Sequence, residues 1–295
     1  FPAPREPGHA QAFGAVAGYR SGLGTLCRRS RQIACAERRW TLCRGTAVKR
    51  VLITAGGSGI GRAMAEAFDT AGYEVWVTDV DAAALDTCPD HWLCHLASAT
   101  DEAAMAAVAK DMGQIDVLCA NAGIAGPTAL IEDVALEDFR ACVSVNLEGA
   151  FIAAKHAAPS MKAAGAGAII VTSSTAGIYG YPNRAPYAAA KWAMLGLMKT
   201  LAMELGPFGI RVNAICPGAV EGPRMEGVLN REAKAKGMTR DQVYDGYASG
   251  TSMRSFVEAR DIANMAVFLG SDGARLVSGQ VIAVDGHTEN PDPKL

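Results

Sequence analysis

The stretch Lys49-Arg-Val-Leu-Ile-Thr-Ala-Gly-Gly-Ser-Gly-Ile-Gly61 decides the fold of this 295-residue chain. Its short apolar run, Val51–Thr54, predicts a buried strand. A glycine-rich turn follows at once, and the residues after it have the composition of a helix. A strand, a tight glycine turn and a helix in direct succession are typical of the first unit of an α/β sheet.

Strand-like and helix-like segments alternate along the rest of the chain. The predicted strands are Val51–Thr54, Val75–Asp79, Trp92–Leu96, Ile115–Ala120, Ala168–Ser173, Ile210–Ile215 and Val281–Val284. The predicted helices are Gly61–Thr70, Glu102–Asp111, Leu136–Ala164, Pro186–Leu205 and Ala259–Leu269. This order predicts an α/β fold, a doubly wound parallel sheet (Rossmann fold) of about seven strands with helices on both faces.

Composition fits one globular domain over residues 48–290, followed by a tail at 291–295. Half of the residues are hydrophobic and 20% are charged, as in a protein with a large core. No run of 18 or more apolar residues occurs, so we expect no membrane span. The eight cysteines form no paired framework, which favours reduced thiols and a cytoplasmic protein.

A cluster of Cys88, His91, Cys94 and His95 resembles a set of metal ligands. A strand would point Cys94 and His95 to opposite faces, because side chains alternate along a strand. We therefore expect no metal site.

Residues 1–47 differ from the rest of the chain in charge. The first 50 residues carry ten Lys or Arg and two acids, whereas the remainder carries 18 Lys or Arg and 28 Asp or Glu. A secretory signal is disfavoured because no sustained apolar stretch occurs. A transit peptide, a nucleic-acid-binding arm and a disordered or mis-annotated extension remain as interpretations. We favour the extension and expect no nucleic-acid partner.

The glycine turn Thr54–Gly61 predicts a nucleotide site, with a merely tight connection as the alternative. Glycines let the backbone approach a pyrophosphate, and the helix N-terminus favours its negative charge. Asp79 follows about 20 residues later, where an acid accepts hydrogen bonds from a ribose diol. It would repel a 2′-phosphate, and Val80 is no compensating arginine, so NAD is favoured over NADP. A solvated or helix-capping role for Asp79 is the alternative.

Two amide-bearing segments follow. Asn121-Ala122-Gly123 comes after the fourth predicted strand, and so small a loop would let a cofactor lie close to the backbone. Asn146 interrupts an apolar stretch of a predicted helix. By itself, such a residue would more often kink the helix or make a hydrogen bond in the core.

Tyr187 and Lys191 are spaced so that they share one face of a helix. A free tyrosine has a pKa of about 10 and is a poor base at neutral pH until a nearby cation stabilises its phenolate. Ser174, after the apolar run Ala168–Val171, would offer a hydroxyl to a reacting carbonyl. The spacing is weak evidence alone and depends on its context.

Together these residues resemble the short-chain dehydrogenase/reductase family over residues 48–288. The resemblance rests on the glycine turn, Asp79, Asn121-Ala122-Gly123, Asn146, Ser174, Tyr187, Lys191 and Pro217-Gly218. It implies that Ser174 orients and polarises the substrate oxygen and that Tyr187 is the acid/base. It also implies that Lys191 lowers the tyrosine pKa and binds the nicotinamide ribose, while Asn146 holds a water in a proton relay.

The resemblance also implies a set of cofactor contacts. These are Gly56, Ser58, Gly59, Ile60, Gly61, Asp79, Asn121, Ala122, Gly123, Tyr187, Lys191, Pro217, Gly218 and Val220. Four residues depart from the family pattern and concern cofactor affinity rather than reaction type. Ala55 stands where the family has the first glycine of the turn, and Ala120 where it has the first asparagine of an Asn-Asn-Ala-Gly pattern. Ser98 stands where an acid often contacts adenine, and Gly222 where a threonine often contacts the nicotinamide amide.

We expect an NAD-dependent dehydrogenase or carbonyl reductase acting on a secondary alcohol or ketone. An NADPH-dependent 3-oxoacyl-thioester reductase would be expected to carry a basic residue where Ser58 or Val80 occurs. A catalytically silent nucleotide-sensing protein is disfavoured by the intact catalytic set. The resemblance suggests a homotetramer packed through the helices that carry Asn146 and Tyr187.

The polar segment Glu221–Arg254 interrupts the alternation and is the predicted substrate lid, with a solvent-exposed helical pair as the alternative. Candidate pocket residues are Arg224 and Arg254 for an acidic substrate, Met225 and Met253 for an apolar one, and Tyr179 and Tyr181 as walls. Surface or packing roles for these residues remain open.

Overall fold

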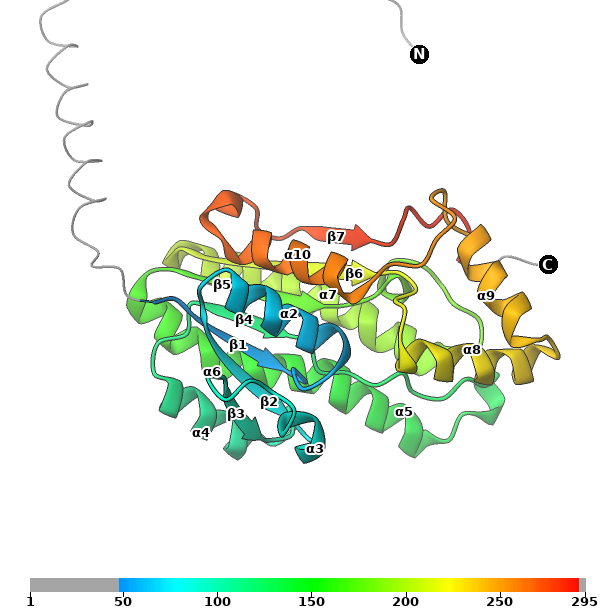
Figure 1. The fold of residues 1–295 in the computed structure, drawn as a ribbon, viewed down its shortest axis with the longest axis horizontal. Coiled ribbons are helices and arrows are strands. Elements are labelled where there is room, and N and C mark those ends of the chain that lie inside the picture. The colour runs from blue at the N-terminus through cyan, green and yellow to red at the C-terminus, as the bar shows by residue number, and fades with distance from the viewer. Residues whose placement is uncertain (1–47, 292–295) are drawn as a thin grey trace, which may run out of the picture. The chain divides into compact units, whose positions relative to one another are not determined.

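The computed structural model describes residues 48–291, so the expectations for residues 1–47 and 292–295 lie outside the described part. Seven parallel strands form a sheet in the order β3-β2-β1-β4-β5-β6-β7 (Figure 1). The strands are β1 (Arg50–Thr54), β2 (Glu74–Asp79), β3 (Leu93–Leu96), β4 (Val117–Ala120), β5 (Gly167–Thr172), β6 (Ile210–Pro217) and β7 (Val281–Val284). The doubly wound parallel sheet predicted from the sequence is confirmed.

Helices cover both faces of the sheet. They are α2 (Gly59–Thr70), α3 (Ala82–Leu85), α4 (Glu102–Met112), α5 (Leu136–Val143), α6 (Gly149–Ala164), α7 (Ala185–Leu205), α8 (Pro223–Lys236), α9 (Arg240–Ser249) and α10 (Ala259–Gly270). Leu52 of β1 packs in the core with α4, α6 and α7, while Val51 and Ile53 pack in the core with α2 and α10. Side chains alternate along a strand, so one apolar run serves both cores.

No helix of residues 48–291 combines the length and the hydropathy needed to cross a bilayer.

The segment predicted as a helix over Leu136–Ala164 is helical throughout, but it is not a uniform α-helix. A π-helical turn over Ser144–Glu148 separates α5 from α6. Asn146 lies in this turn, and its Nδ2 donates to the carbonyl of Cys142 at 2.8 Å. A side chain that bonds the carbonyl four residues back competes with the helical hydrogen bonds, and π-turns are frequent at functional sites.

The segment predicted as a lid folds into α8 and α9, which lie beyond the carboxyl ends of the strands (Figure 1). The two helices have a small core of their own, built on Leu229, Ala233 and Val243. Phe256 stacks on Tyr244 with ring centroids 4.2 Å apart. These contacts give the segment a defined shape next to the open end of the sheet.

Candidate active site

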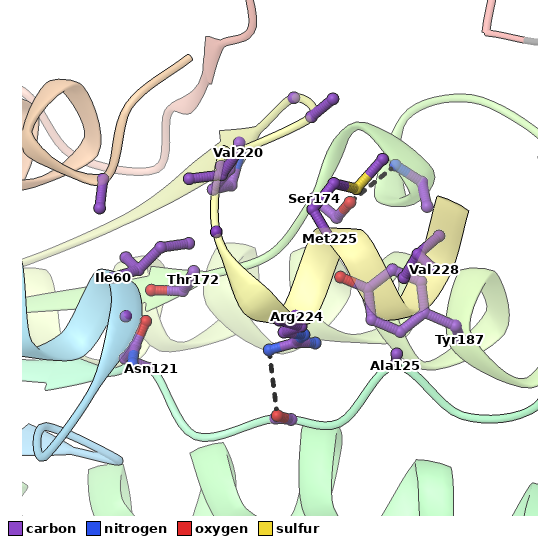
Figure 2. Close-up of a pocket in the computed structure, with 18 of the residues that line it drawn as sticks. Ile60, Asn121, Ala125, Thr172, Ser174, Tyr187, Val220, Arg224, Met225 and Val228 are labelled. Atoms are coloured by element: carbon purple, nitrogen blue, oxygen red, sulfur yellow. Dashed lines mark hydrogen bonds between the residues drawn. The ribbon is translucent and has the colours of Figure 1, made fainter. Parts of the chain in front are cut away.

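A cavity of about 530 Å³ opens at the carboxyl ends of the central strands. The strand order reverses between β1 and β4, which are neighbours in the sheet although two strands separate them along the chain. The crevice at such a reversal is where open α/β sheets bind ligands. Its walls come from the glycine turn, the loops after β4, β5 and β6, and helices α7 to α9 (Figure 2).

Most of the predicted site residues line this cavity. Those that do are Ser58, Gly59, Ile60, Gly61, Asp79, Asn121, Gly123, Ser174, Tyr187, Lys191, Pro217, Gly218 and Val220. Gly56, Ala122 and Asn146 are not part of its lining. A Cβ on Gly56 would come within 2.8 Å of Val77 Cγ1, so this glycine permits close packing of the turn on β2.

The turn after β1 has the shape of a cradle for a phosphate. A Cβ on Gly61 would lie only 2.0 Å from the carbonyl oxygen of Ala55, so a side chain would force the turn apart. The N-cap residue of α2, Ser58, makes no side-chain cap, which leaves the first N–H groups of the helix without that partner. Free N–H groups and the helix dipole both favour an anion there, so the turn fits a pyrophosphate.

Ala55 occupies the position where the family has its first glycine, and its φ is +51°. This left-handed conformation is unfavourable for a residue with a side chain, by about 1–2 kcal/mol. The departure noted in the sequence therefore introduces local strain in the turn.

Asp79 is fixed at the end of β2 by backbone hydrogen bonds. Its Oδ2 accepts from Gly57 N at 2.9 Å, and its Oδ1 accepts from the amides of Val80 (2.8 Å) and Asp81 (3.2 Å). An ionised carboxylate has about four acceptor positions, so one remains beyond these three bonds. The residue borders the cavity and is buried, with a polar acceptor still available to a ligand hydroxyl.

Asn121 ties the loop after β4 to the glycine turn. Its Nδ2 donates to the carbonyls of Thr54 (3.2 Å) and Ala55 (3.3 Å). Thr54 completes the link, because its Oγ1 accepts from the amides of Asn121 (3.0 Å) and Ala122 (2.9 Å). Sequence reasoning missed Thr54, although a hydroxyl at the end of a buried strand is a signal for such a role.

Tyr187 and Lys191 lie together on α7 at the cavity wall. Lys191 is buried, and its Nζ donates to the carbonyl of Thr172 at 2.8 Å and lies 5.6 Å from the centroid of the Tyr187 ring. Burial alone would raise the pKa of Tyr187. The Lys191 ammonium opposes this most strongly, helped by Arg224, a Ser174 hydrogen bond and Arg184, and the net pKa is lowered. Burial also lowers the pKa of Lys191, although the neighbouring Tyr187 counteracts it.

Ser174 follows β5 and faces the same cavity. Its Oγ accepts from the amide of Ala176 at 3.1 Å, a contact that fixes the side chain (Figure 2). The Ser174 side chain also helps to lower the pKa of Tyr187. The arrangement places two hydroxyl groups and one ammonium group at one end of the cavity, as an acid/base site requires.

Asn146 lies immediately behind this group. Its Nδ2 donates to the carbonyls of Ile124 (3.0 Å) and Cys142 (2.8 Å), whereas its buried Oδ1 has no hydrogen-bond partner within residues 48–291. A Cβ built on Gly123 would lie 2.5 Å from that Oδ1 and 3.4 Å from Lys191 Nζ. A buried acceptor without a partner, close to an ammonium group, is where a bridging water is expected.

Arg184 was missed by the sequence reasoning. It is the N-cap residue of α7 and borders the cavity, with its guanidinium stacked over the Tyr187 ring at 4.8 Å from the centroid. Its position three residues before Tyr187 was the available signal, since residues three apart share a helix face. Its Nη2 donates to the carbonyl of Ala125 at 3.2 Å.

Only part of the candidate substrate set borders the cavity. Arg224, Met225 and Tyr181 line it, together with Val228 and Tyr247. Met253, Arg254 and Tyr179 do not. Arg254 instead bonds the carbonyl of Ser249 and lies 3.9 Å from Glu289, while the Tyr179 hydroxyl donates to the carbonyl of Thr288.

Comparisons with known proteins agree with this geometry. Residues 54–287 match the protein family described as Enoyl-(Acyl carrier protein) reductase. Levodione reductase of Leifsonia aquatica is 35% identical over 249 residues, which cover 80% of this chain and 92% of the relative. The 2-keto-3-deoxy-L-fuconate dehydrogenase of Xanthomonas campestris pv. campestris is 36% identical over 82% of this chain and 80% of the relative.

A solved structure shares the fold at similar coverage. The crystal structure of NAD⁺-bound xylitol dehydrogenase superposes with a TM-score of 0.78 and 29% identity, covering 81% of this chain and 98% of that one. The sheet order, the cavity at the strand reversal and these relatives lead to one conclusion. The chain belongs to the short-chain dehydrogenase/reductase family and is an oxidoreductase.

Proposed function

We propose that this protein transfers a hydride between NAD(H) and a secondary alcohol or ketone, with Tyr187 as the acid/base. The observation that carries the proposal is the position of Tyr187 at the cavity wall, with the Nζ of buried Lys191 5.6 Å from its ring centroid and Ser174 lining the same cavity. Burial raises the pKa of Tyr187, but the cations led by Lys191 lower it, and the net direction is downward. A base is most effective when its pKa approaches the working pH. The reductase and dehydrogenases among the relatives support the same class of reaction.

Each residue of the group has a separate task in alcohol oxidation. Ser174 donates a hydrogen bond to the substrate oxygen and orients it, while the Tyr187 phenolate accepts the hydroxyl proton. A bound nicotinamide supplies the hydride acceptor, which no side chain can provide. Lys191 stabilises the phenolate and binds the nicotinamide ribose. Asn146, through its unpartnered Oδ1, holds a water that passes the proton outward.

The glycine turn would hold the pyrophosphate, through Ser58 to Gly61, and Asp79 would accept from the adenosine ribose. The acidic side chain and the absence of a basic residue at Ser58 or Val80 support NAD over NADP. The NAD⁺-bound xylitol dehydrogenase supports the same preference. Equal kcat/KM values with NAD and NADP would overturn this assignment.

A panel of secondary alcohols and ketones with NAD(H), followed by the absorbance of the reduced nicotinamide, tests the reaction. We expect turnover with at least one neutral or charged secondary alcohol. Absence of turnover across the panel, in protein that still binds NAD, would favour a nucleotide-sensing role and overturn the proposal.

We also propose that the protein acts as a homo-oligomer. The resemblance to the family implies a tetramer. Large apolar side chains on α6 and α7 are exposed, including Phe151 (49%) and Trp192 (51%). Large apolar side chains exposed on these helices are available for an interface between copies of the chain. Light scattering on the purified protein tests this, and a monomer at micromolar concentration would contradict it.

A further inference from the structure

The cavity contains two arginines for which alcohol oxidation has no need. Arg184 enters from the N-terminus of α7, and Arg224 reaches down from α8 toward the loop after β4, where its Nη1 donates to Gly123 O at 3.2 Å (Figure 2). Neither makes an ion pair with a carboxylate among residues 48–291. We infer that they bind a carboxylate of the substrate, so that the enzyme acts on secondary hydroxy acids or the corresponding oxo acids.

Arg184 is the stronger of the two observations. The residue is only 8% exposed, and its buried Nε has no hydrogen-bond partner among the described residues. Its one hydrogen bond to the described residues, from Nη2 to Ala125 O, satisfies one of five donors. Burying a charged group without a counter-ion is unfavourable, and a carboxylate that met the planar guanidinium edge would satisfy two donors at once.

The place of Arg184 in the helix points the same way. It is the N-cap residue of the 21-residue helix α7, where the helix dipole favours anions and disfavours cations. A buried guanidinium at this end is therefore in conflict with the dipole. A bound anion resolves the conflict, because both the guanidinium and the helix terminus attract it.

The acids of the cavity lining and the buried Glu232 of α8 all have other hydrogen-bond partners than the two arginines. Glu232 accepts from the Tyr247 hydroxyl at 2.8 Å and pairs with Lys236, also at 2.8 Å. Glu221, at the cavity wall, accepts from the Tyr244 hydroxyl at 2.8 Å. Asp79, the other acid of the lining, is held by backbone amides of the glycine turn and the loop after β2.

Stacking of Arg184 on Tyr187 places the anion site next to the acid/base. The reaction is unchanged: the hydroxyl-bearing carbon loses a hydride to NAD⁺, its oxygen loses a proton to Tyr187, and the carboxylate is not altered. This assignment of substrate class rests on the proposed function. It adds to that function the requirement that the substrate carry a negative charge a short distance from the reacting oxygen.

Three isomeric acids, 3-, 4- and 5-hydroxyhexanoate, vary the distance between hydroxyl and carboxylate at constant size. Their primary amides have the same shape and no charge. With enzyme and NAD⁺, we expect the best acid to exceed its amide in kcat/KM by about tenfold or more, the effect of a charged hydrogen-bonded pair. An amide that is used as well as its acid at every spacing would overturn the inference while leaving the proposed oxidoreductase intact.

Arg184→Gln and Arg224→Gln should each reduce the acid-to-amide ratio, by raising KM for the acid. Arg231→Gln is the matched control, because Arg231 is exposed on α8 and does not line the cavity. An unchanged ratio in both cavity variants would contradict the assignment, and Arg224→Gln keeps the test available if Arg184→Gln does not fold.

A binding measurement separates the two hypotheses. Calorimetry of hexanoate and hexanamide with the NAD-loaded wild type needs no turnover. We expect hexanoate to bind about tenfold more tightly. If no alcohol is oxidised but hexanoate is preferred, the proposed function fails and the anion site remains. If hexanamide binds equally well, the anion site fails.

Discussion

Replacing Gly61 with alanine tests the structure of the nucleotide turn. Gly61 is the third residue of α2, and in an ordinary helix interior a glycine-to-alanine change stabilises the protein by about 1 kcal/mol. Here the added Cβ would lie 2.0 Å from Ala55 O and 2.8 Å from Asn121 Nδ2. The expected sign is therefore reversed.

The size of the change in unfolding free energy follows from the displacement of the Ala55 carbonyl. The Ala55 carbonyl has to retreat from 2.0 Å to at least 3.0 Å, and it is an acceptor for Asn121 Nδ2. Overpacking costs about 1–3 kcal/mol and a lost hydrogen bond about 1 kcal/mol, against about 1 kcal/mol gained in helix propensity. We expect Gly61→Ala to lose about 1–3 kcal/mol of unfolding free energy.

Gly196→Ala is the matched control, since a Cβ on this glycine of α7 would meet no atom within 4 Å. It should gain about 1 kcal/mol. Urea unfolding of both variants without nucleotide measures their free energies of unfolding. The rise in melting temperature on addition of NAD then shows whether the turn still binds the nucleotide. A Gly61→Ala protein as stable as the control variant, with an undiminished response to NAD, would refute the reasoning.

Three further predictions concern the chemistry. Tyr187→Phe should lose about 10²–10⁴-fold in turnover while keeping its thermal stabilisation by NAD, and near-normal turnover would contradict the acid/base role. Burial raises the pKa of Tyr187, whereas Lys191 and then Arg224 lower it. Removing the Arg224 charge in Arg224→Gln should therefore raise this pKa and move the rising limb of the pH–rate profile for alcohol oxidation to higher pH. A shift of that limb to lower pH would contradict the prediction. Asp79→Asn should reduce the preference of kcat/KM for NAD over NADP by about tenfold, or ~1.4 kcal/mol, and an unchanged ratio would remove Asp79 from cofactor selection.

Sequence patterns predicted the sheet well because its central strands are buried on both faces. Continuous apolar runs such as Val51–Thr54 and Ala168–Val171 mark such strands, and glycines and polar residues mark their ends. For Asn146 the sequence predicted a helix kink or a core hydrogen bond, and the structure has a local distortion together with side-chain bonds to Ile124 and Cys142. The π-helical form of that distortion was not predicted, because it depends on these contacts rather than on local propensity.

The residues of the candidate site also differ in whether local sequence could predict their positions. Tyr187 and Lys191 are four residues apart, and helical geometry alone brings them together. Arg184 is the N-cap residue of that helix, but its hydrogen bond to the carbonyl of Ala125 joins residues far apart in the sequence. Arg254 was grouped with Arg224 because both lie in the lid segment, yet the fold of that segment leaves Arg254 outside the cavity. Tertiary contacts of this kind leave no local signature.

The segment predicted as a lid is attached in a way that allows its exchange as a unit. Helices α8 and α9 share their own small core, and isolated bridges at Val220–Val257 and Thr251–Thr288 brace the segment where it joins the rest of the domain. Tyr187 and Lys191 belong to α7, outside that segment. A segment from a relative, grafted in place of residues 221–254, would therefore import a different substrate preference while Tyr187 and Lys191 stay in place, provided that it keeps an arginine at position 224, which lowers the pKa of Tyr187. The part of the selectivity that depends on Arg184, at the N-terminus of α7, is then engineered separately from the part that the segment carries.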